Sequence, residues 1–591
     1  MEILAAEDID IGTDLIPPLS PLASSLYDSF LSSHCSSCFS LLPQAPPHPH
    51  YCSAACSLTD SPIDSPQSPP EISPILPSDI RTALRLLNST VVVTSSSPHR
   101  LNGLLTNHHR IMSDPSLSVA IQNAASFIAT FLRSNRENTE LEEAAICSVL
   151  TNAVEVQDST GLALGIALYD SRFSWINHSC SPNSCYRFVN TITTSYQDGL
   201  AFAKTIPHII TNTETSSNFE SKAFCSLQEQ GRTVGYGPKV IVRSIKKIKD
   251  GEEITVSYMD LLQPTGLRQS DLWSKYRFMC NCGRCVASPP AYVDSILELE
   301  VSLIRVLKIA NLYDAFIQGV LALEPEITTV SHFHGTTNKD EAAGKMSDHI
   351  QGAIDDFLSD DINRKTCCEK IESVLHHGIQ IKADSSQPHH LRLHPCHHVA
   401  LNAYITLATA YKIRSVDSEI DMGKAFEMSR ISAAYSFFLA CASHHLFSAE
   451  PSFAISATSF WKNAGESLLD LALKFSMESS VETTYKCTKC LTLETPNSHR
   501  DIKEKSRQIL SCVTDISQVV WSFLTRGCPY LAKFRSPVDF SFATTNGDRE
   551  ESNEDQMVNV ILLSFHCLLY ADLLTDLCYG QKSHWVSRCL V

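Results

Sequence analysis

The stretch Asn-His-Ser-Cys-Ser-Pro-Asn at residues 177–183 decides the fold of this chain when it is taken together with two later segments. The first is Gly-Glu-Glu-Ile-Thr-Val-Ser-Tyr at residues 251–258, and the second is the cysteine cluster Cys280-x-Cys282-x2-Cys285. No single segment decides a function, because an isolated histidine or tyrosine is more often a packing residue than a functional one. The order and spacing of all three segments carry the interpretation.

Length and composition bound the class of protein. The 591 residues are enough for two to four domains with a large core. Charged residues make up 19% and hydrophobic residues 43%, which is typical of a globular protein. The net charge of −17 argues against direct nucleic-acid binding and suits a basic partner such as a lysine-rich tail, although many ordinary proteins are as acidic.

Targeting signals and cysteine usage indicate in which kind of cellular compartment the chain folds. The first eight residues are acidic and lack a positive segment, so we expect no secretory signal. The most apolar stretch, residues 558–574, contains Asn559, His566 and Asp572, which favours a buried helix over a membrane span. Without an export signal, the 22 cysteines indicate metal ligands and buried thiols, not disulfides.

Hydrophobic periodicity predicts helices in the first third of the chain. Ile80, Ala83, Leu84 and Leu87 fall on one face of a helix, and the same spacing returns at residues 120–132. Residues 57–78, which precede this helical region, are rich in Pro and Ser, and such a composition is typical of an extended linker.

The pattern then changes twice. Short β-like runs appear at residues 165–169 and 240–242, separated by turn residues. Residues 190–238 are rich in Thr, Ser and Asn, which predicts a surface insertion. From about residue 290 the spacing is helical again, as at Leu297 and Val301, and resembles stacked helical hairpins of the tetratricopeptide kind.

This helical region also contains side chains that could be mistaken for metal ligands. They are His389, His390, His394, Cys396, His397, His398, Cys487 and Cys490. The histidine-rich group at residues 389–398 and the Cys487–Cys490 pair each lack a second ligand pair at a suitable spacing. We therefore interpret both groups as helix-end or packing residues. A helical lobe of this kind would form one wall of a substrate cleft or dock partner proteins.

Taken together, the three motifs resemble the catalytic half of a SET-domain lysine methyltransferase. The whole chain is similar to the SMYD branch of that family, in which a zinc finger interrupts the SET domain. The resemblance implies an α+β fold: a β-rich SET core with an inserted zinc finger and a helical insert, followed by an all-α tetratricopeptide-like C-terminal domain. In such a core the first motif threads under another loop, an arrangement that is rare among proteins.

The resemblance also implies a division of the chain into segments. These are the N-terminal part of the SET domain (1–34), a reduced MYND-like zinc finger (35–56), a Pro/Ser-rich linker (57–78), a helical SET insert (79–146), the SET catalytic core (147–262, with its surface insertion at 190–238), a post-SET zinc segment (263–289) and the helical C-terminal domain (290–591).

By resemblance, the cofactor would be S-adenosylmethionine. Asn177 and His178 would contact its adenosyl and amino-acid parts, largely through the backbone. Ser174 and Ile176 match neighbouring contacts, and Asn152 stands where the family places an Asn against the methionine carboxylate. The alternative for His178 by itself is a core histidine with satisfied hydrogen bonds.

Three aromatic residues would form the catalytic centre. Tyr258 would hold the target lysine amine against the sulfonium carbon, while Tyr276 and Phe278 would close the lysine channel and the cofactor face, with Phe278 and Tyr258 also touching the cofactor. Methyl transfer is an in-line displacement, so orientation supplies much of the rate. The lysine must be neutral, and nearby positive charge with loss of water lowers its pKa, so no strong base is required. Structural packing is the alternative for each aromatic ring.

Two structural zinc sites are expected. Three thiols at residues 280–285 lack one ligand for a tetrahedral site, and the family supplies the fourth from the first motif, where Cys180 stands. The second site resembles half of a MYND finger, which in full binds two zinc ions. Its expected ligands are Cys35, Cys38, Cys52 and Cys56. Buried free thiols are the alternative for both sites.

One expected element lies at the start of the sequence. Family members have a Gly-x-Gly loop before the strand that here reads Leu4 to Gly12, and this loop would precede Leu4. The expected function is therefore an S-adenosylmethionine-dependent protein-lysine N-methyltransferase acting on histone or other protein lysines in chromatin. Without the Gly-x-Gly loop, the cofactor pocket would lack one wall. That would favour the alternative, a SET-derived scaffold with little or no transferase activity that binds protein partners. Nucleus and cytoplasm both remain open.

Overall fold

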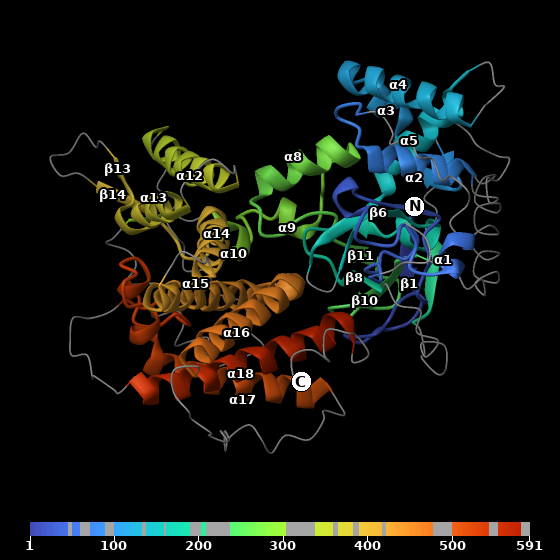
Figure 1. Ribbon diagram of the computed structural model, residues 1–591. Coiled ribbons are helices and arrows are strands. Elements are labelled where there is room, and N and C mark those ends of the chain that lie inside the picture. Colours follow the sequence, from blue (N-terminus) through green and yellow to red (C-terminus); the bar gives the residue numbers. More distant parts are fainter. Residues whose placement is uncertain are drawn as a thin grey trace. The chain divides into compact units, whose positions relative to one another are not determined.

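The part of the chain that the structure describes forms two compact units. The computed structural model describes residues 1–44, 50–59, 71–88, 100–132, 138–158, 161–189, 203–208, 237–298, 300–302, 337–358, 364–381, 389–416, 421–476, 499–542 and 553–580. Unit 1 comprises Met1–Leu261, Thr265–Val286 and a C-terminal piece starting at Leu577, and unit 2 comprises Leu262–Pro264 and Ala287–Asp576. Figure 1 shows the helices and strands of the two units.

Unit 1 is built on small, mostly antiparallel sheets. Its strands are β1 (Glu2–Ala5), β2 (Ala23–Leu26), β3 (Arg100–Leu101), β4 (Leu104–Leu105), β5 (Val154–Gln157), β6 (Ala163–Leu168), β7 (Asn177–His178), β8 (Ser184–Val189), β9 (Thr205–His208), β10 (Lys239–Ser244) and β11 (Thr255–Val256). β6 lies between β2 and β5, β8 pairs with β10, and β7 pairs with β11 in parallel. The apolar run at residues 240–242 is completely buried in β10, as expected of an interior strand.

The N-terminal strand has a partner that lies far away in the sequence. β1 pairs antiparallel with β9, so that Leu4 lies opposite Ile206. β9 falls inside the segment predicted to be a surface insertion, so residues 205–208 of that segment form a strand, and Ile206 in it is exposed. A strand gains most of its stability from its neighbour, which composition does not reveal. Most of residues 190–238 lie outside the described residues.

The predicted insert forms helices that pack on one another and, in part, on the strands of unit 1. They are α2 (Pro77–Asn88), α3 (His108–Met112), α4 (Pro115–Phe131) and α5 (Glu140–Asn152). Ile80, Ala83 and Leu84 are buried, which confirms the predicted helical face. Asp114 caps α4 by accepting hydrogen bonds from the backbone of Ser116 and Leu117. α5 extends to residue 152, past the predicted start of the β-rich core at residue 147.

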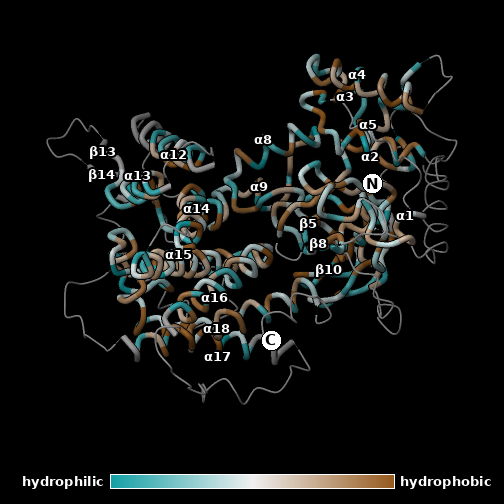
Figure 2. The backbone as a smooth tube through the Cα atoms, viewed as in Figure 1, coloured by the Kyte–Doolittle hydropathy of each residue, from teal (hydrophilic) through white to brown (hydrophobic). Residues whose placement is uncertain are grey.

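Unit 2 is largely helical. Its longer helices are α12 (Thr337–Leu358), α13 (Arg364–His377), α14 (His398–Ser415), α15 (Met422–Ala449), α16 (Ala454–Ser476), α17 (His499–Leu524) and α18 (Asn553–Tyr579). α15 packs against both α14 and α16, and small or aromatic residues fill its buried positions. Figure 2 shows α13 mostly in hydrophilic colours, whereas α16 and α18 carry more apolar residues.

The prediction that the C-terminal domain is all-α is wrong at one place. β12 (Glu300–Ser302), β14 (His389–Leu393) and β13 (Ile379–Ile381) form a three-stranded antiparallel sheet. Val301, expected on a helix, pairs with Arg392 in this sheet. Its hydrophobic spacing with Leu297 fits a helix locally, but the strand partner comes from about 90 residues later, beyond the reach of a periodicity argument.

The apolar stretch at residues 558–574 lies in α18. By length and composition alone, its segment Gln556–Tyr579 is long and apolar enough to cross a membrane, although the core helix of a soluble protein passes the same test. Val560, Leu563 and Cys567 are completely buried in unit 2. Burial of these side chains agrees with the predicted interior helix.

Candidate active site

The two sequence motifs meet at a parallel pairing of very short strands. In this pairing Asn177 lies opposite Thr255 and His178 lies opposite Val256. Asn183 joins the same segments, because its amide nitrogen donates to the Glu253 carbonyl at 2.8 Å and its Oδ1 accepts from the Thr255 N–H at 2.9 Å. The first motif is thereby fixed against the second along its whole length.

A half-buried carboxylate orients the side chain of Asn177. The Asn177 amide donates to Glu253 Oε1 at 2.7 Å and to the Met1 carbonyl at 2.9 Å. Burial raises the pKa of Glu253, and the hydrogen bond from Asn177 partly offsets that effect. These bonds leave the backbone of the Asn-His pair in one conformation, as a cofactor contact through the backbone would require.

His178 uses both of its ring nitrogens. Its Nδ1 accepts a hydrogen bond from the backbone N–H of Tyr258 at 3.0 Å, and its Nε2 lies 3.3 Å from Cys180 Sγ. A neutral imidazole that accepts at Nδ1 carries its proton on Nε2, so the assigned tautomer donates to the sulfur. His178 is buried and both of its ring nitrogens have hydrogen-bond partners. One partner, Tyr258, is a predicted catalytic residue, and the other, Cys180, is a predicted metal ligand.

Four rings form an aromatic cluster, defined here as His178, Tyr258, Tyr276 and Phe278. The ring centroids of Tyr258 and Tyr276 are 4.8 Å apart, and His178 lies 5.4 Å from Tyr258 and 6.2 Å from Phe278. Tyr276 ends α8 (Thr265–Tyr276) and Phe278 follows it. The structure thus gathers the three aromatic residues predicted from the sequence around the histidine.

Hydrogen bonding and burial define the state of the tyrosines. The Tyr258 hydroxyl donates to the Ile176 carbonyl at 2.6 Å. Burial raises the pKa of Tyr276 to about 12 and raises the pKa of Tyr258 further above its ordinary value. Both phenols therefore keep their protons at neutral pH, and Tyr258 presents oxygen lone pairs to a neighbouring group.

The remaining predicted cofactor residues have different settings. Ser174 closes α6 (Ser171–Ser174) and its hydroxyl donates to the Tyr169 carbonyl at 2.9 Å, while Ile176 is buried. The Asn152 amide nitrogen donates to the carbonyls of Leu105 at 2.7 Å and Ser148 at 2.8 Å. Because an amide nitrogen has two hydrogens, contact with a carboxylate through this atom requires one of these bonds to open.

The structure brings together the sulfurs of Cys180, Cys280, Cys282 and Cys285, called the Cys180 cluster, within 4.8 Å of one another. Gln269 holds the start of this segment through two 2.8 Å hydrogen bonds to the backbone of Cys280. Shared hydrogen bonds with Cys180 lower the pKa of Cys280 and of Cys282. Thiolates in a compact group of four are the donor set that a tetrahedral Zn²⁺ ion takes.

Two buried arginines surround this cluster. Arg268 Nε donates to Cys180 Sγ at 3.3 Å, and Arg284 donates to the carbonyls of Cys180 at 3.0 Å and Leu261 at 3.1 Å. Arg268 is completely buried. Four thiolates around a divalent cation leave two negative charges, and buried guanidinium groups offset such charge. The residues present therefore fit a zinc ion.

A second group of four sulfurs, Cys35, Cys38, Cys52 and Cys56, also lies within 4.8 Å and is called the Cys35 cluster. α1 (Ala54–Thr59) carries the last of these cysteines. The sulfur of Cys52 lies 3.5 Å from that of Cys38 and 3.6 Å from that of Cys56, separations that suit ligands of one tetrahedral ion. Each cysteine in the described part of the chain is free of a disulfide.

The histidines of unit 2 serve local structure. His397 precedes α14 and caps it by accepting from the Val399 N–H at 3.2 Å, and His394 Nδ1 accepts from the Cys396 N–H at 3.1 Å. Burial lowers the pKa of His394 and of His397 to about 3. These contacts confirm the interpretation as helix-end and packing residues for His394 and His397. His389 and His390 lie in strand β14 instead, and Cys487 and Cys490 lie outside the described residues.

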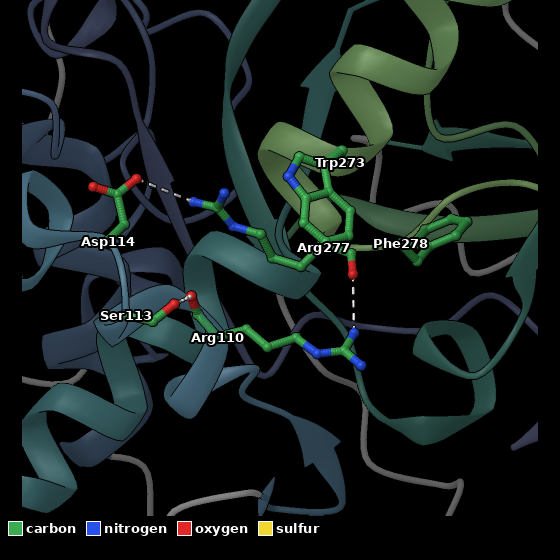
Figure 3. Close-up of a pocket in the computed structure, with 6 residues that line it drawn as sticks. All are labelled: Arg110, Ser113, Asp114, Trp273, Arg277 and Phe278. Atoms are coloured by element: carbon green, nitrogen blue, oxygen red, sulfur yellow. Dashed lines mark hydrogen bonds and ion pairs between the residues drawn. The ribbon is translucent and has the colours of Figure 1, made fainter.

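A cavity of about 660 Å³ in unit 1 adjoins the aromatic cluster at Phe278. It is lined by Arg110, Ser113, Asp114, Trp273, Arg277 and Phe278 (Figure 3). Arg110 donates to the Arg277 carbonyl at 2.9 Å, and the Arg277 side chain reaches Asp114 at 3.7 Å. Apart from Phe278, sequence reasoning missed these residues, because they come from α3, the start of α4 and the end of α8, with no shared motif.

Comparison with known proteins decides the family. The family model described as SET domain matches residues 2–259. The Protein SET DOMAIN GROUP 41 of Arabidopsis thaliana is 75% identical over 594 residues, covering 100% of both chains. The chain belongs to the SET-domain family. That result confirms the resemblance drawn from the motifs and the α+β fold class.

More distant relatives of this SET-domain protein carry SMYD or MYND names. The histone-lysine N-methyltransferase SMYD3 of Mus musculus is 26% identical over 141 residues, which are 24% of this chain and 22% of that protein. The SET domain and MYND-type zinc finger protein 6 of Schizosaccharomyces pombe is 24% identical over 243 residues, covering 40% and 38%. These similarities support a protein of the SET-domain lysine methyltransferase kind.

Proposed function

We propose that this SET-domain protein is an S-adenosylmethionine-dependent protein-lysine N-methyltransferase. The observation that carries the proposal is the aromatic cluster at the junction of the two motifs, with the Tyr258 hydroxyl oriented by the Ile176 carbonyl. A target lysine needs orientation and exclusion of water more than it needs an acid or a base, and packed aromatic rings contribute to both.

Tyr258 acts as a hydrogen-bond acceptor. Its proton is held by the Ile176 carbonyl at 2.6 Å, so its oxygen lone pairs accept an N–H of the lysine amine and aim the nitrogen lone pair along the channel. Because burial raises the pKa of Tyr258, this residue does not remove the lysine proton as a phenolate.

The aromatic rings prepare the lysine for attack. S-adenosylmethionine, when bound, would supply a methyl group on its sulfonium for the lysine nitrogen, and the lysine ammonium would first give up its proton to water. Burial beside Tyr258 and Tyr276 removes water from the ammonium and favours its neutral form. Ring faces also attract a cationic sulfonium.

Other residues hold the groups that the reaction needs. The backbone of Asn177 and His178, which Glu253 and Tyr258 hold in place, would contact the cofactor, and Phe278 would form the face beside it. Ser174, Ile176 and Asn152 stay predicted cofactor contacts. The Cys180 and Cys35 clusters would each hold one structural Zn²⁺ ion, on the donor chemistry given above.

The proposed substrates are lysines of histone tails or of other proteins, in the nucleus, the cytoplasm or both. The net charge of −17 supports attraction of a lysine-rich segment. The helical unit 2 supplies a surface for protein partners, as helical repeats commonly do. The histone substrate named for SMYD3 belongs to that relative and enters here as part of the proposal.

Calorimetric binding of S-adenosylmethionine to the purified, zinc-loaded protein tests the function. We expect micromolar binding by the wild type and by Tyr258→Phe, and its loss when Asn177 and His178 are both changed to Ala. Methyl transfer to histones and to cell extract, followed by mass spectrometry of methyl-lysine, then identifies the substrate. A folded, zinc-loaded wild type that binds no cofactor contradicts the proposal and leaves the scaffold interpretation.

A further inference from the structure

One side chain connects the metal-ligand cluster with the proposed catalytic tyrosine. His178 accepts the Tyr258 backbone N–H at Nδ1, 3.0 Å away, and faces Cys180 Sγ with Nε2 at 3.3 Å. The imidazole is buried, so neither nitrogen can easily exchange its partner for water. A single rigid ring therefore spans the distance between the two sites.

The two hydrogen bonds depend on each other. Acceptance at Nδ1 requires the proton on Nε2, and a proton on Nε2 needs an acceptor, which the Cys180 sulfur provides. The ring has only one orientation that meets both requirements. Tyr258 is also tied through its hydroxyl to the Ile176 carbonyl, two residues before His178. The segment from Ile176 to His178 therefore binds Tyr258 at its backbone N–H and at its hydroxyl, and a shift of the His178 ring would disturb both contacts.

Arg268 offers a natural comparison. Its Nε donates to the same sulfur at the same 3.3 Å distance, but its Nη2 donates to Thr265 Oγ1 at 3.0 Å, on its own helix α8. Arg268 supplies positive charge to the thiolates, as His178 does in part through its N–H. Only the His178 contact continues to the backbone N–H of Tyr258.

We propose that His178 is a positioning residue that couples metal occupancy of the Cys180 cluster to the geometry of Tyr258. Metal binding fixes the sulfur, the sulfur fixes the Nε2–H, and the ring then holds the Tyr258 N–H. By linkage, whatever orders the site around Tyr258 strengthens metal binding, and metal binding strengthens ligand binding at that site by the same factor. The catalytic consequence rests on the proposed function, whereas the coupling itself does not.

Two substitutions test the roles of the two imidazole nitrogens one at a time. His178→Asn places an amide oxygen near the position of Nδ1, so it keeps an acceptor for the Tyr258 N–H and loses the donor to Cys180. His178→Gln places an amide nitrogen near the position of Nε2, so it keeps the donor and loses the acceptor. Arg268→Gln weakens the other hydrogen bond to the same sulfur and serves as the matched control.

The first measurement follows the Tyr258 amide by hydrogen exchange and mass spectrometry, before and after a chelator removes the metal. In the wild type and in Arg268→Gln, chelation should speed exchange of the peptide containing Tyr258 roughly tenfold, the factor that corresponds to one net hydrogen bond. In His178→Asn, exchange should stay the same on chelation. In His178→Gln, exchange should be fast in both states. Equal acceleration in the wild type and His178→Asn, or none in the wild type, overturns the proposal.

The second measurement uses the cobalt-substituted protein and its sulfur-to-cobalt absorption. S-adenosylhomocysteine, a non-reacting cofactor analogue, should shift the band of the wild type and of Arg268→Gln and leave that of His178→Asn unchanged. Cobalt in the Cys35 cluster gives a constant background and shows that each variant is folded. A shift of equal size in His178→Asn means that the coupling runs through another path.

The two proposals fail in different ways. If the analogue binds no variant and not the wild type, the methyltransferase proposal fails while the exchange measurement still decides the coupling. If the analogue binds normally and chelation leaves Tyr258 exchange unchanged in the wild type, the coupling fails and the proposed function stands.

Discussion

Buried histidines make the helical unit 2 sensitive to acid. Burial lowers the pKa of His394 and of His397 from the ordinary 6.5 to about 3. Unfolded chains bind these protons near pH 6.5 and the folded unit does not, so the free energy of unfolding falls as the pH drops from 6.5 toward 3. One pH unit in this window costs about 1.4 kcal/mol per histidine, so at pH 5 the two residues together remove about 4 kcal/mol.

The double variant His394→Asn/His397→Asn isolates this contribution. Asn does not titrate, and it is a favoured N-cap residue, so it can keep the acceptor role toward the Cys396 and Val399 N–H groups. Urea unfolding at pH 7 and pH 5, read by a brief exchange pulse at one fixed pH on peptides from α14, measures the effect in this unit alone. The wild type should lose about 4 kcal/mol more than the variant between the two pH values. Equal losses would refute the reasoning.

Three further predictions concern unit 1. Tyr258→Phe should lower kcat about 10- to 100-fold, the effect of losing one transition-state hydrogen bond, while the calorimetric Kd for S-adenosylmethionine changes little; unchanged kcat would remove Tyr258 from the mechanism. Cys282→Ser should lower the zinc content from two ions to one per chain by elemental analysis, and an unchanged content would show that the Cys180 cluster holds no ion. Asn183→Ala should lower the free energy of unfolding of unit 1 by about 2–3 kcal/mol, because it removes hydrogen bonds to Glu253 and Thr255. Asn183→Asp keeps an acceptor for the Thr255 N–H but sets a carboxylate beside Glu252, whose Oε1 accepts from the Asn183 amide at 3.2 Å, so it should cost at least as much in the same urea titration.

The residues of the candidate site could be predicted because they stand in short motifs. The Asn-His pair, Tyr258 and the cysteines each have a restricted spacing, and the structure gathers Cys180 with the cysteines at residues 280–285. The helix faces were also predictable, since Ile80 and Leu84 are four residues apart and share one side of α2.

The parts that escaped prediction depend on partners far away in the chain. β9 forms because β1 offers it an edge, and β12 forms because β14 does. The cavity beside Phe278 arises where α3, α4 and α8 meet, and Arg277 adopts a positive φ of 61° there, which no local pattern announces. The double role of the His178 ring was likewise invisible, since the resemblance suggested mainly backbone contacts.

The parallel pairing of β7 with β11 has a consequence for biosynthesis. Asn177 is synthesised before its partners Glu253 and Thr255, and β1 is synthesised before its partner β9. These early segments therefore leave the ribosome long before the segments that they pair with. Pairings between such distant segments form slowly and expose unpaired strands meanwhile. A chain that ends before residue 253 lacks Glu253 and Thr255, so its first motif has no β11 to pair with and its unpaired strands favour aggregation.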